Sequence, residues 1–193
     1  MKKQSLILAT FLALGSVAVN GQETLTPPYT QDFYYQSDFN TMTVIDANSD
    51  GFKWSYSEWS FPGNYSNAAR LSPNSANGAD DWIITPALEL KAGYSYNFSF
   101  KAAGADNCEN NIDVMIGSVA TAEALTTSVM DKVVLTAKVS NTYTANITVA
   151  NDGAYYIGLH ITAEASQGYV YIDDIKIEAG ILGVAPAAAT AFT

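Results

Sequence analysis

The stretch from Gly153 to Glu178 reads "GAYYIGLHITAEASQGYVYIDDIKIE" and holds two apolar runs. In both runs apolar and polar residues alternate, and Tyr, Ile and Val dominate, as is typical of side chains packed on a pleated surface. The residues between the runs, "EASQG", are the small and polar ones of a turn. The stretch therefore predicts two β-strands joined by a turn.

The same pattern recurs along most of the chain between Gln31 and Glu178. Turns rich in Asn, Asp, Gly and Ser separate short apolar runs, and only residues 120–130 have helical spacing. Parallel α/β folds need long crossover helices, which this pattern lacks. We predict an all-β fold, a jelly-roll β-sandwich of two antiparallel sheets. The expected strands are residues 42–46, 52–59, 81–90, 94–104, 111–118, 132–139, 143–150, 153–162 and 169–178.

The two ends of the chain differ from this middle part. The chain begins "MKKQSLILATFLALGSVAVNGQE", with two lysines, an apolar run and small residues, which is the layout of a secretory signal peptide. The apolar run is shorter than the ~20 residues of a membrane-spanning helix. We therefore predict a signal peptide at 1–21 and one domain at 22–179. The uncharged end at 180–193, "GILGVAPAAATAFT", is predicted to be a linker or the start of a following module.

Charge and cysteine content exclude several classes of protein. Without Lys2 and Lys3, seven basic residues face nineteen acidic ones, which argues against nucleic acid and anionic lipid as partners. Cys108 is the only cysteine, so the exported chain has no disulfide framework and depends on its core. A domain of this length buries about two-thirds of its unfolded surface, which is sufficient.

Residues 46–51, "DANSDG", have the spacing of oxygen ligands for calcium. Asp46, Asn48 and Asp50 followed by Gly51 match the first half of an EF-hand loop. The second half fails, because Ser57 stands at the twelfth position and no helices flank the loop. A tight turn can still direct three oxygens inward, but calcium needs six to eight, so another segment must contribute. An Asx-rich turn with solvated carboxylates is the alternative.

The final strand is the favoured source of the missing ligands. Asp173 and Asp174 form a charged pair inside an apolar strand, which is costly without a partner. Asp32 and the pair Asp80–Asp81 are weaker candidates.

Aromatic residues are concentrated in "FKWSYSEWSFPGNY", residues 52–65. Trp54 is expected in the core because it alternates with other large apolar residues on one strand face. Trp59 and Phe61 fall where the strand ends before Pro62. We take these two as candidate ligand-binding residues, since exposed aromatic rings can stack on sugar rings.

The sequence offers little for catalysis. His160 is the sole histidine and alternates within a strand, and the motifs of serine hydrolases, zinc proteases and phosphate loops do not occur. The paired carboxylates Asp80–Asp81 and Asp173–Asp174 project to opposite faces of extended segments, so neither pair forms a glycosidase dyad. We predict that the chain is not an enzyme.

Four segments, in order, resemble the cleaved-adhesin or choice-of-anchor J family, which includes the adhesin modules of gingipain-type proteases. They are "DANSDGFKW", "DDWIITPALEL", "IDVMIGSVATAEA" and the stretch 153–178. The resemblance implies a MAM-like jelly roll, structural calcium, and display on or secretion from a Gram-negative bacterium, often within a longer multidomain chain.

Two functions follow as expectations. The first is a secreted or cell-surface, non-catalytic adhesin-type domain that binds a host or matrix protein or a glycan, with calcium stiffening its loops. The alternative is a carbohydrate-binding module of a larger secreted enzyme. An exposed aromatic platform beside a groove favours a glycan ligand, whereas a flat surface favours protein adhesion or a spacer role.

Overall fold

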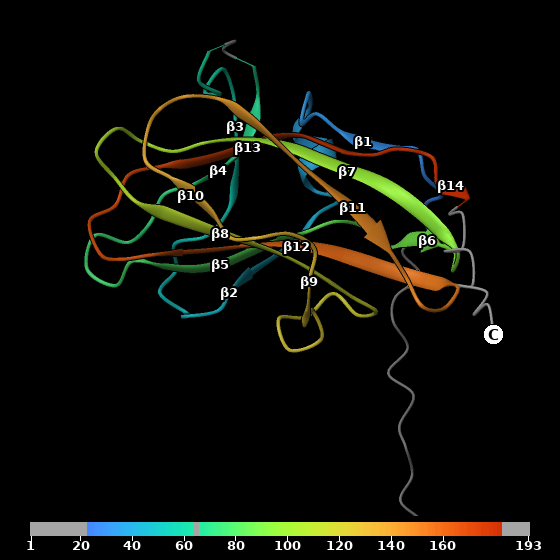
Figure 1. The fold of residues 1–193 in the computed structure, drawn as a ribbon. Helices are drawn as coiled ribbons and strands as arrows, with labels where there is room; N and C mark the ends of the chain where they lie inside the picture. Colours follow the sequence, from blue (N-terminus) through green and yellow to red (C-terminus); the bar gives the residue numbers. More distant parts are fainter. Residues whose placement is uncertain (1–22, 64–65, 183–193) are drawn as a thin grey trace, which may run out of the picture.

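The computed structural model describes residues 23–63 and 66–182 as a sandwich of two β-sheets (Figure 1). The predicted signal peptide and most of the predicted linker lie outside these residues. All pairs between the named strands are antiparallel, which confirms the predicted fold class.

Each sheet is named here by its central strand. The β13 sheet has the order β11 (Asn141–Thr148), β7 (Tyr94–Ala103), β13 (Val170–Ile177), β4 (Ala68–Leu71) and β3 (Ser55–Ser57), with β1 (Tyr29–Gln31) beside β13 and β14 (Ile181–Leu182) beside β7. The β12 sheet has the order β10 (Val133–Leu135), β8 (Asn110–Gly117), β12 (Gly153–Ala163), β5 (Ala79–Ile84) and β2 (Thr43–Asp46), with β6 (Leu88–Leu90) beside β12 and β9 (Thr127–Ser128) beside β8.

The core lies between the two sheets. Alternate residues of each strand point inward, as the period of two requires. Ile83, Leu159 and Val114 come from neighbouring strands of the β12 sheet, and Phe98 and Ile172 come from the β13 sheet; all five are fully buried. Trp54 is also buried, as predicted.

Residues 120–130 do not form a helix despite their helical spacing. They form a turn that places Leu125 on the outer face of the β12 sheet, against Trp82 and Ile84, and then enter β9. Burial of Leu125 on the sheet replaces the packing that a short amphipathic helix would need. In the part of the chain described, the single helix is α1 (Gln36–Phe39).

The predicted strand 81–90 is divided into β5 and β6. Pro86 lies between them and has no N–H to donate to a sheet, so the ladder is interrupted there.

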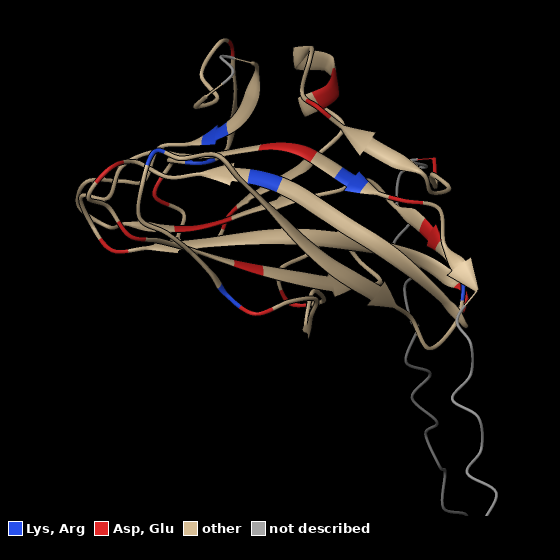
Figure 2. Ribbon diagram, turned by 45° about the horizontal axis from the view of Figure 1, so that its top comes forward, with Lys and Arg blue, Asp and Glu red and all other residues tan. Residues whose placement is uncertain are grey.

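Acidic residues outnumber basic ones along the ribbon (Figure 2). No helix among residues 23–63 and 66–182 is long and apolar enough to cross a membrane.

Candidate functional site

Exposed aromatic rings gather where β3 meets the segment before α1. Tyr34 is 63% exposed, Tyr35 62% and Trp59 75%. Together with Tyr56, these residues line a hollow of about 370 Å³, named here the aromatic hollow; its other lining residues are Glu58, Ser66 and Asn67. Large apolar groups clustered at the surface of a soluble domain mark binding sites more often than scattered ones do.

Asn67 ties the two segments of the aromatic hollow together. Its side-chain oxygen accepts a hydrogen bond from the Trp59 N–H (3.1 Å), and its amide nitrogen donates to the Tyr34 carbonyl (2.6 Å). The Tyr56 hydroxyl donates to the same carbonyl (3.3 Å). Trp59 itself has φ 55°, a left-handed conformation that is strained for a bulky residue. The hollow is therefore held in shape by specific contacts.

The tyrosines are positioned by two aspartates. Asp32 accepts a hydrogen bond from the Tyr34 N–H (3.1 Å), and Asp38 in α1 accepts one from the Tyr35 N–H (2.8 Å). The two tyrosine rings then meet edge to face, with centroids 4.6 Å apart. This is a favourable geometry for aromatic pairs.

Phe61 is much more buried than Trp59. It is 1% exposed and packs against Ala68 and Tyr171. A ligand contact at Phe61 stays a prediction, because Phe61 is among the residues that line a hollow beside Trp59. The left-handed turn at Trp59 breaks the alternation of the strand, and the loop that follows folds Phe61 down onto the β13 sheet. Phe61 thus anchors the loop that exposes Trp59.

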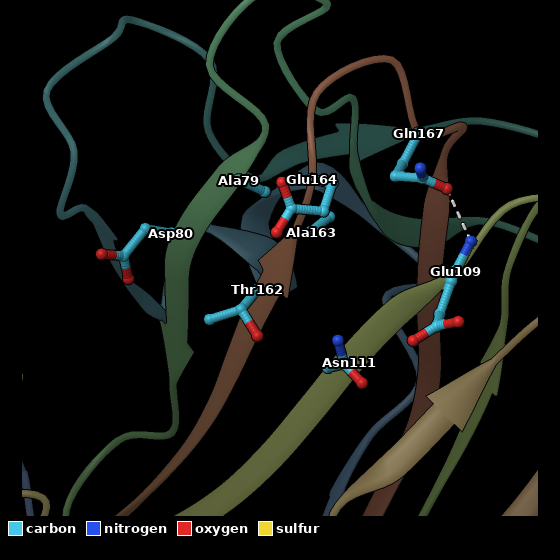
Figure 3. A pocket seen from close by; sticks show the side chains of 8 residues that line it. All are labelled: Ala79, Asp80, Glu109, Asn111, Thr162, Ala163, Glu164 and Gln167. Carbon is cyan, nitrogen blue, oxygen red and sulfur yellow. Dashed lines mark hydrogen bonds between the residues drawn. The ribbon is translucent and has the colours of Figure 1, made fainter.

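A second kind of hollow lies on the outer face of the β12 sheet (Figure 3). Its volume is about 460 Å³, and its lining includes Asp80, Glu109, Asn111 and Glu164. The Gln167 side chain accepts a hydrogen bond from the Glu109 N–H at its rim (2.6 Å). None of the described residues that line it is aromatic, in contrast to the aromatic hollow.

The loop 46–51 is a compact turn at the end of β2. Asp46 accepts hydrogen bonds from the N–H groups of Asp50 (3.1 Å) and Gly51 (2.8 Å), and Asp50 accepts one from Phe52 (2.9 Å). Asn48 also contacts the Asp50 carboxylate (3.4 Å). Gly51, with φ 84°, permits the bend. The turn thus brings Asp46, Asn48 and Asp50 together.

A further acidic residue, Asp81 of β5, lies beside this turn in the structure. It lies directly opposite Asp46 in the β2–β5 pair, is 1% exposed, and its Oδ1 atom has no hydrogen-bond partner. Burial, together with the charges of Asp46 and Asp50, raises the pKa of Asp81 to about 7. The sequence analysis ranks the pair Asp80–Asp81 as a weaker candidate for a calcium ligand, because the sequence does not show that β2 and β5 are neighbours.

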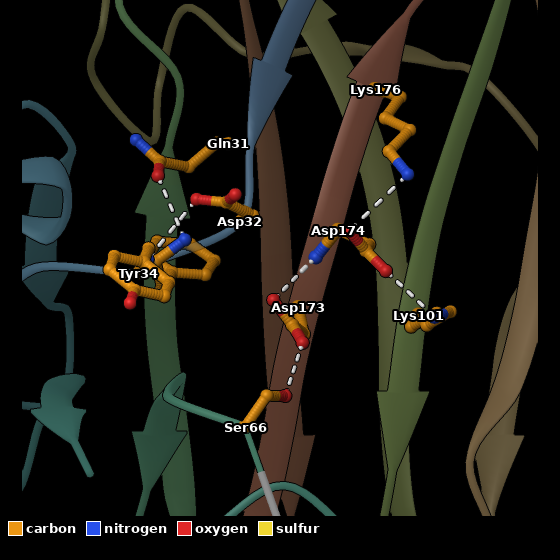
Figure 4. A network of polar contacts seen from close by, with 9 residues as sticks. Gln31, Asp32, Tyr34, Ser66, Lys101, Asp173, Asp174 and Lys176 are labelled. Atoms are coloured by element: carbon orange, nitrogen blue, oxygen red, sulfur yellow. Dashed lines mark hydrogen bonds and ion pairs between the residues drawn. The ribbon is translucent and has the colours of Figure 1, made fainter. Parts of the chain in front are cut away.

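Asp173 and Asp174 lie in the other sheet and have partners of their own (Figure 4). Asp173 accepts a hydrogen bond from the Ser66 hydroxyl (2.9 Å), and burial raises its pKa to about 6. Asp174 pairs with Lys101 (2.7 Å) and Lys176 (3.3 Å). Although burial acts in the opposite direction, these two lysines lower the pKa of Asp174. The structure therefore does not bring the final strand to the 46–51 turn.

The carboxylate and amide oxygens at the 46–51 turn are of the chemical type that binds calcium. Carboxylate and amide oxygens are the ligands that calcium prefers, and an unpartnered buried carboxylate oxygen is costly without a cation or donor. In the described residues, however, no group of three or more His, Cys, Asp or Glu side chains is arranged to hold a metal ion. Ligation would require Asp46 and Asp50 to turn from the backbone amides toward Asp81.

Comparison with known proteins rests on structure alone. No family model matches the sequence, and no curated protein matches it. The K1 cleaved adhesin domain of Lys-gingipain from Porphyromonas gingivalis W83 superimposes with a TM-score of 0.60 and 19% identity, covering 78% of this chain and 97% of that domain. The fold is cleaved-adhesin-like.

Two further structures share this cleaved-adhesin-like fold. The K3 cleaved adhesin domain of Lys-gingipain has a TM-score of 0.58 and 18% identity, over 78% of this chain and 98% of that one. The CBM22-2 xylan-binding domain of Xyn10C from Paenibacillus barcinonensis has a TM-score of 0.53 and 15% identity, over 78% and 98%. Adhesin and carbohydrate-binding domains thus share one architecture with this chain.

Proposed function

We propose that this chain is a secreted or surface-displayed, non-catalytic domain that binds a glycan in the aromatic hollow. The observation that carries the proposal is Trp59, which is 75% exposed although its backbone is left-handed and its N–H is bound by the Asn67 side chain. Strained backbone and exposed aromatic surface both cost free energy, and they occur together mainly at functional sites.

The chemistry of the hollow suits a sugar. A pyranose ring has an apolar C–H face that packs on an aromatic ring, and hydroxyl groups at its edge that need polar partners. Tyr34, Tyr35 and Trp59 supply the rings, while Glu58 and Asn67 supply polar groups beside them. Apolar walls with a few placed polar groups are typical of small-ligand sites.

The structural neighbours support the same class of function. They include cleaved adhesin domains and a xylan-binding domain, which are named for binding. A carbohydrate-binding module that delivers a larger enzyme to its glycan would use the same hollow. The adhesin-type domain and the carbohydrate-binding module expected from the sequence would therefore share one site.

The test is a glycan array followed by calorimetry with the tightest ligand. Trp59→Ala should weaken binding at least tenfold, equivalent to about 1.4 kcal/mol, because the central stacking surface is lost. Phe52→Ala is the matched control, since Phe52 is an exposed aromatic residue outside the lining of the hollow. Equal affinity of wild type and Trp59→Ala for every bound glycan would contradict the proposal.

We also propose a structural calcium ion at the 46–51 turn. The proposed ligands are Asp46, Asn48, Asp50 and Asp81, and Asp81 takes the role that the sequence analysis assigns to Asp173 or Asp174. The supporting observation is the buried Oδ1 atom of Asp81, which has no partner. Backbone carbonyls and water would complete a calcium shell of six to eight oxygens.

A further inference from the structure

Trp59 lines two hollows. Besides the aromatic hollow, it lines a second one of about 330 Å³, named here the lysine hollow, whose other lining residues include Ser60, Pro62, Lys138 and Tyr171. A single exposed ring therefore forms a wall common to both. A ligand with more than one sugar unit can contact Trp59 and extend into either side.

Lys138 is the one basic residue among the described residues that line these two hollows. It is exposed, and its side chain takes part in none of the ion pairs of residues 23–63 and 66–182, unlike those of Lys101, Lys132 and Lys176. Its backbone N–H donates to Asp106 (2.9 Å), which fixes the loop between β10 and β11. The backbone of Lys138 is thus held in place, while its ammonium group is available to pair with an anion.

The aromatic hollow carries the opposite charge. Among the described residues that line it, Glu58 is the one with a charge, so Glu58 and Lys138 belong to different hollows. A carboxylate or sulfate on a sugar would be repelled by Glu58 and attracted by Lys138. The two hollows therefore present charges of opposite sign.

We infer that the glycan bound by this site is acidic, with a neutral unit in the aromatic hollow and a carboxylate- or sulfate-bearing unit beside Lys138. This inference rests on the proposed glycan function and adds to it both a ligand class and a direction of binding. Since Lys138 is exposed, the preference should be modest, roughly fivefold. Raising the salt concentration should weaken it.

The experiment compares neutral glycans with uronate-, sialate- and sulfate-bearing counterparts of the same backbone, first on an array and then by calorimetry. Wild type should bind the acidic member of a pair about fivefold more tightly, and Lys138→Gln should bind both members equally. Lys91→Gln is the matched control, because Lys91 is an exposed lysine in the turn between β6 and β7, at the other end of the sandwich (Figure 1). Trp59→Ala should weaken both members.

The outcomes separate the two proposals. If wild type binds neutral and acidic members equally, or if Lys138→Gln keeps the preference, the inference about the acidic ligand is overturned while glycan binding stands. If no glycan binds, the proposed function fails and this inference fails with it. If the chain binds an acidic protein and no glycan, both the proposed function and this inference fail. Thermal melts of each variant confirm that it is folded.

Discussion

The side chain of Asn67 contacts both Trp59 and Tyr34, and Tyr34 lies 33 residues before Asn67 in the chain. We expect Asn67→Ala to lower the free energy of unfolding by about 1 kcal/mol, since two hydrogen bonds are lost at a partly solvated position. It should also weaken glycan binding, because Tyr34 and Trp59 are no longer held together. Urea unfolding and calorimetry measure the two effects.

Asn67→Asp is the control for this pair of contacts. It keeps an oxygen for the Trp59 N–H but removes the amide donor to the Tyr34 carbonyl. Its stability should lie between those of wild type and Asn67→Ala. Wild-type affinity in Asn67→Ala would show that the hollow does not depend on this side chain.

Asp81 gives the fold a specific dependence on pH. Its pKa is raised from 3.8 to about 7 in the folded chain, so between these values the folded state binds more protons than the unfolded state. Its contribution to stability is therefore fully present below about pH 4 and is lost as pH rises through 7. Three pKa units correspond to about 4 kcal/mol, as an order of magnitude.

Urea unfolding between pH 5 and 8, in the presence of a chelator, measures this contribution. Wild type should lose more stability than Asp81→Asn as pH rises, because asparagine cannot ionise. Asp173, with a pKa raised to about 6, acts in the same direction but is present in both proteins and cancels in the comparison. Parallel pH curves for the two proteins would contradict the assignment.

On β12, two glycines differ sharply in their surroundings. A Cβ at Gly158 would lie 2.6 Å from Leu125 and 2.9 Å from Trp82, whereas one at Gly153 would lie 3.7 Å from Tyr155. Gly158→Ala should therefore destabilise the protein by about 1–3 kcal/mol, as overpacking does. Gly153→Ala is the matched control and should cost less. Thermal melts of both variants test how tightly the 118–126 turn is packed on the sheet.

The strands could be predicted because buried and exposed residues alternate within each strand, and this alternation is visible in a short stretch of sequence. Alternating residues such as Phe98 and Phe100, or Leu159 and Ile161, indicate both a strand and its inner face. The burial of Phe61 could not be predicted, for an equally local reason. Trp59 and Phe61 would share a face if the chain were extended, but with the positive φ at Trp59 one residue is exposed and the other packs on Ala68 and Tyr171 of the β13 sheet.

The composition of the acidic site was harder to predict, since it depends on which strands become neighbours. The sequence shows Asp46, Asn48 and Asp50 as one turn, because they are close in the chain. It does not show that β2 pairs with β5, nor that β13 belongs to the opposite sheet. Asp81 thus takes the place beside the turn, while Asp173 contacts Ser66.

Calcium should stabilise the folded sandwich as a whole, because an ion that binds only the folded state shifts the unfolding equilibrium. Extracellular calcium modules bind at roughly 10⁻⁴–10⁻³ M, and at tenfold that concentration the gain is about 1.4 kcal/mol. Thermal melts with calcium and with chelator should differ by several degrees. The gain should be larger at pH 8 than at pH 5.5, because binding requires ionised Asp81.

Asp50→Ala and Asp81→Asn should each remove most of this calcium response. Asp173→Asn is the control, because Asp173 lies in the β13 sheet away from the turn, and it should keep the response. Identical melts with calcium and chelator would mean that "DANSDG" is a turn without a metal.

The exposure of Trp59 also gives the molecule an optical reporter of its own. Of the three tryptophans, Trp54 is 2% exposed and Trp82 is 6% exposed, so solvent reaches Trp59 far more than either. A ligand stacked on Trp59 would shift the intrinsic fluorescence to shorter wavelength and shield the indole from acrylamide quenching, while the emission of the two buried rings stays constant. Occupancy of both hollows could then be followed in unlabelled protein.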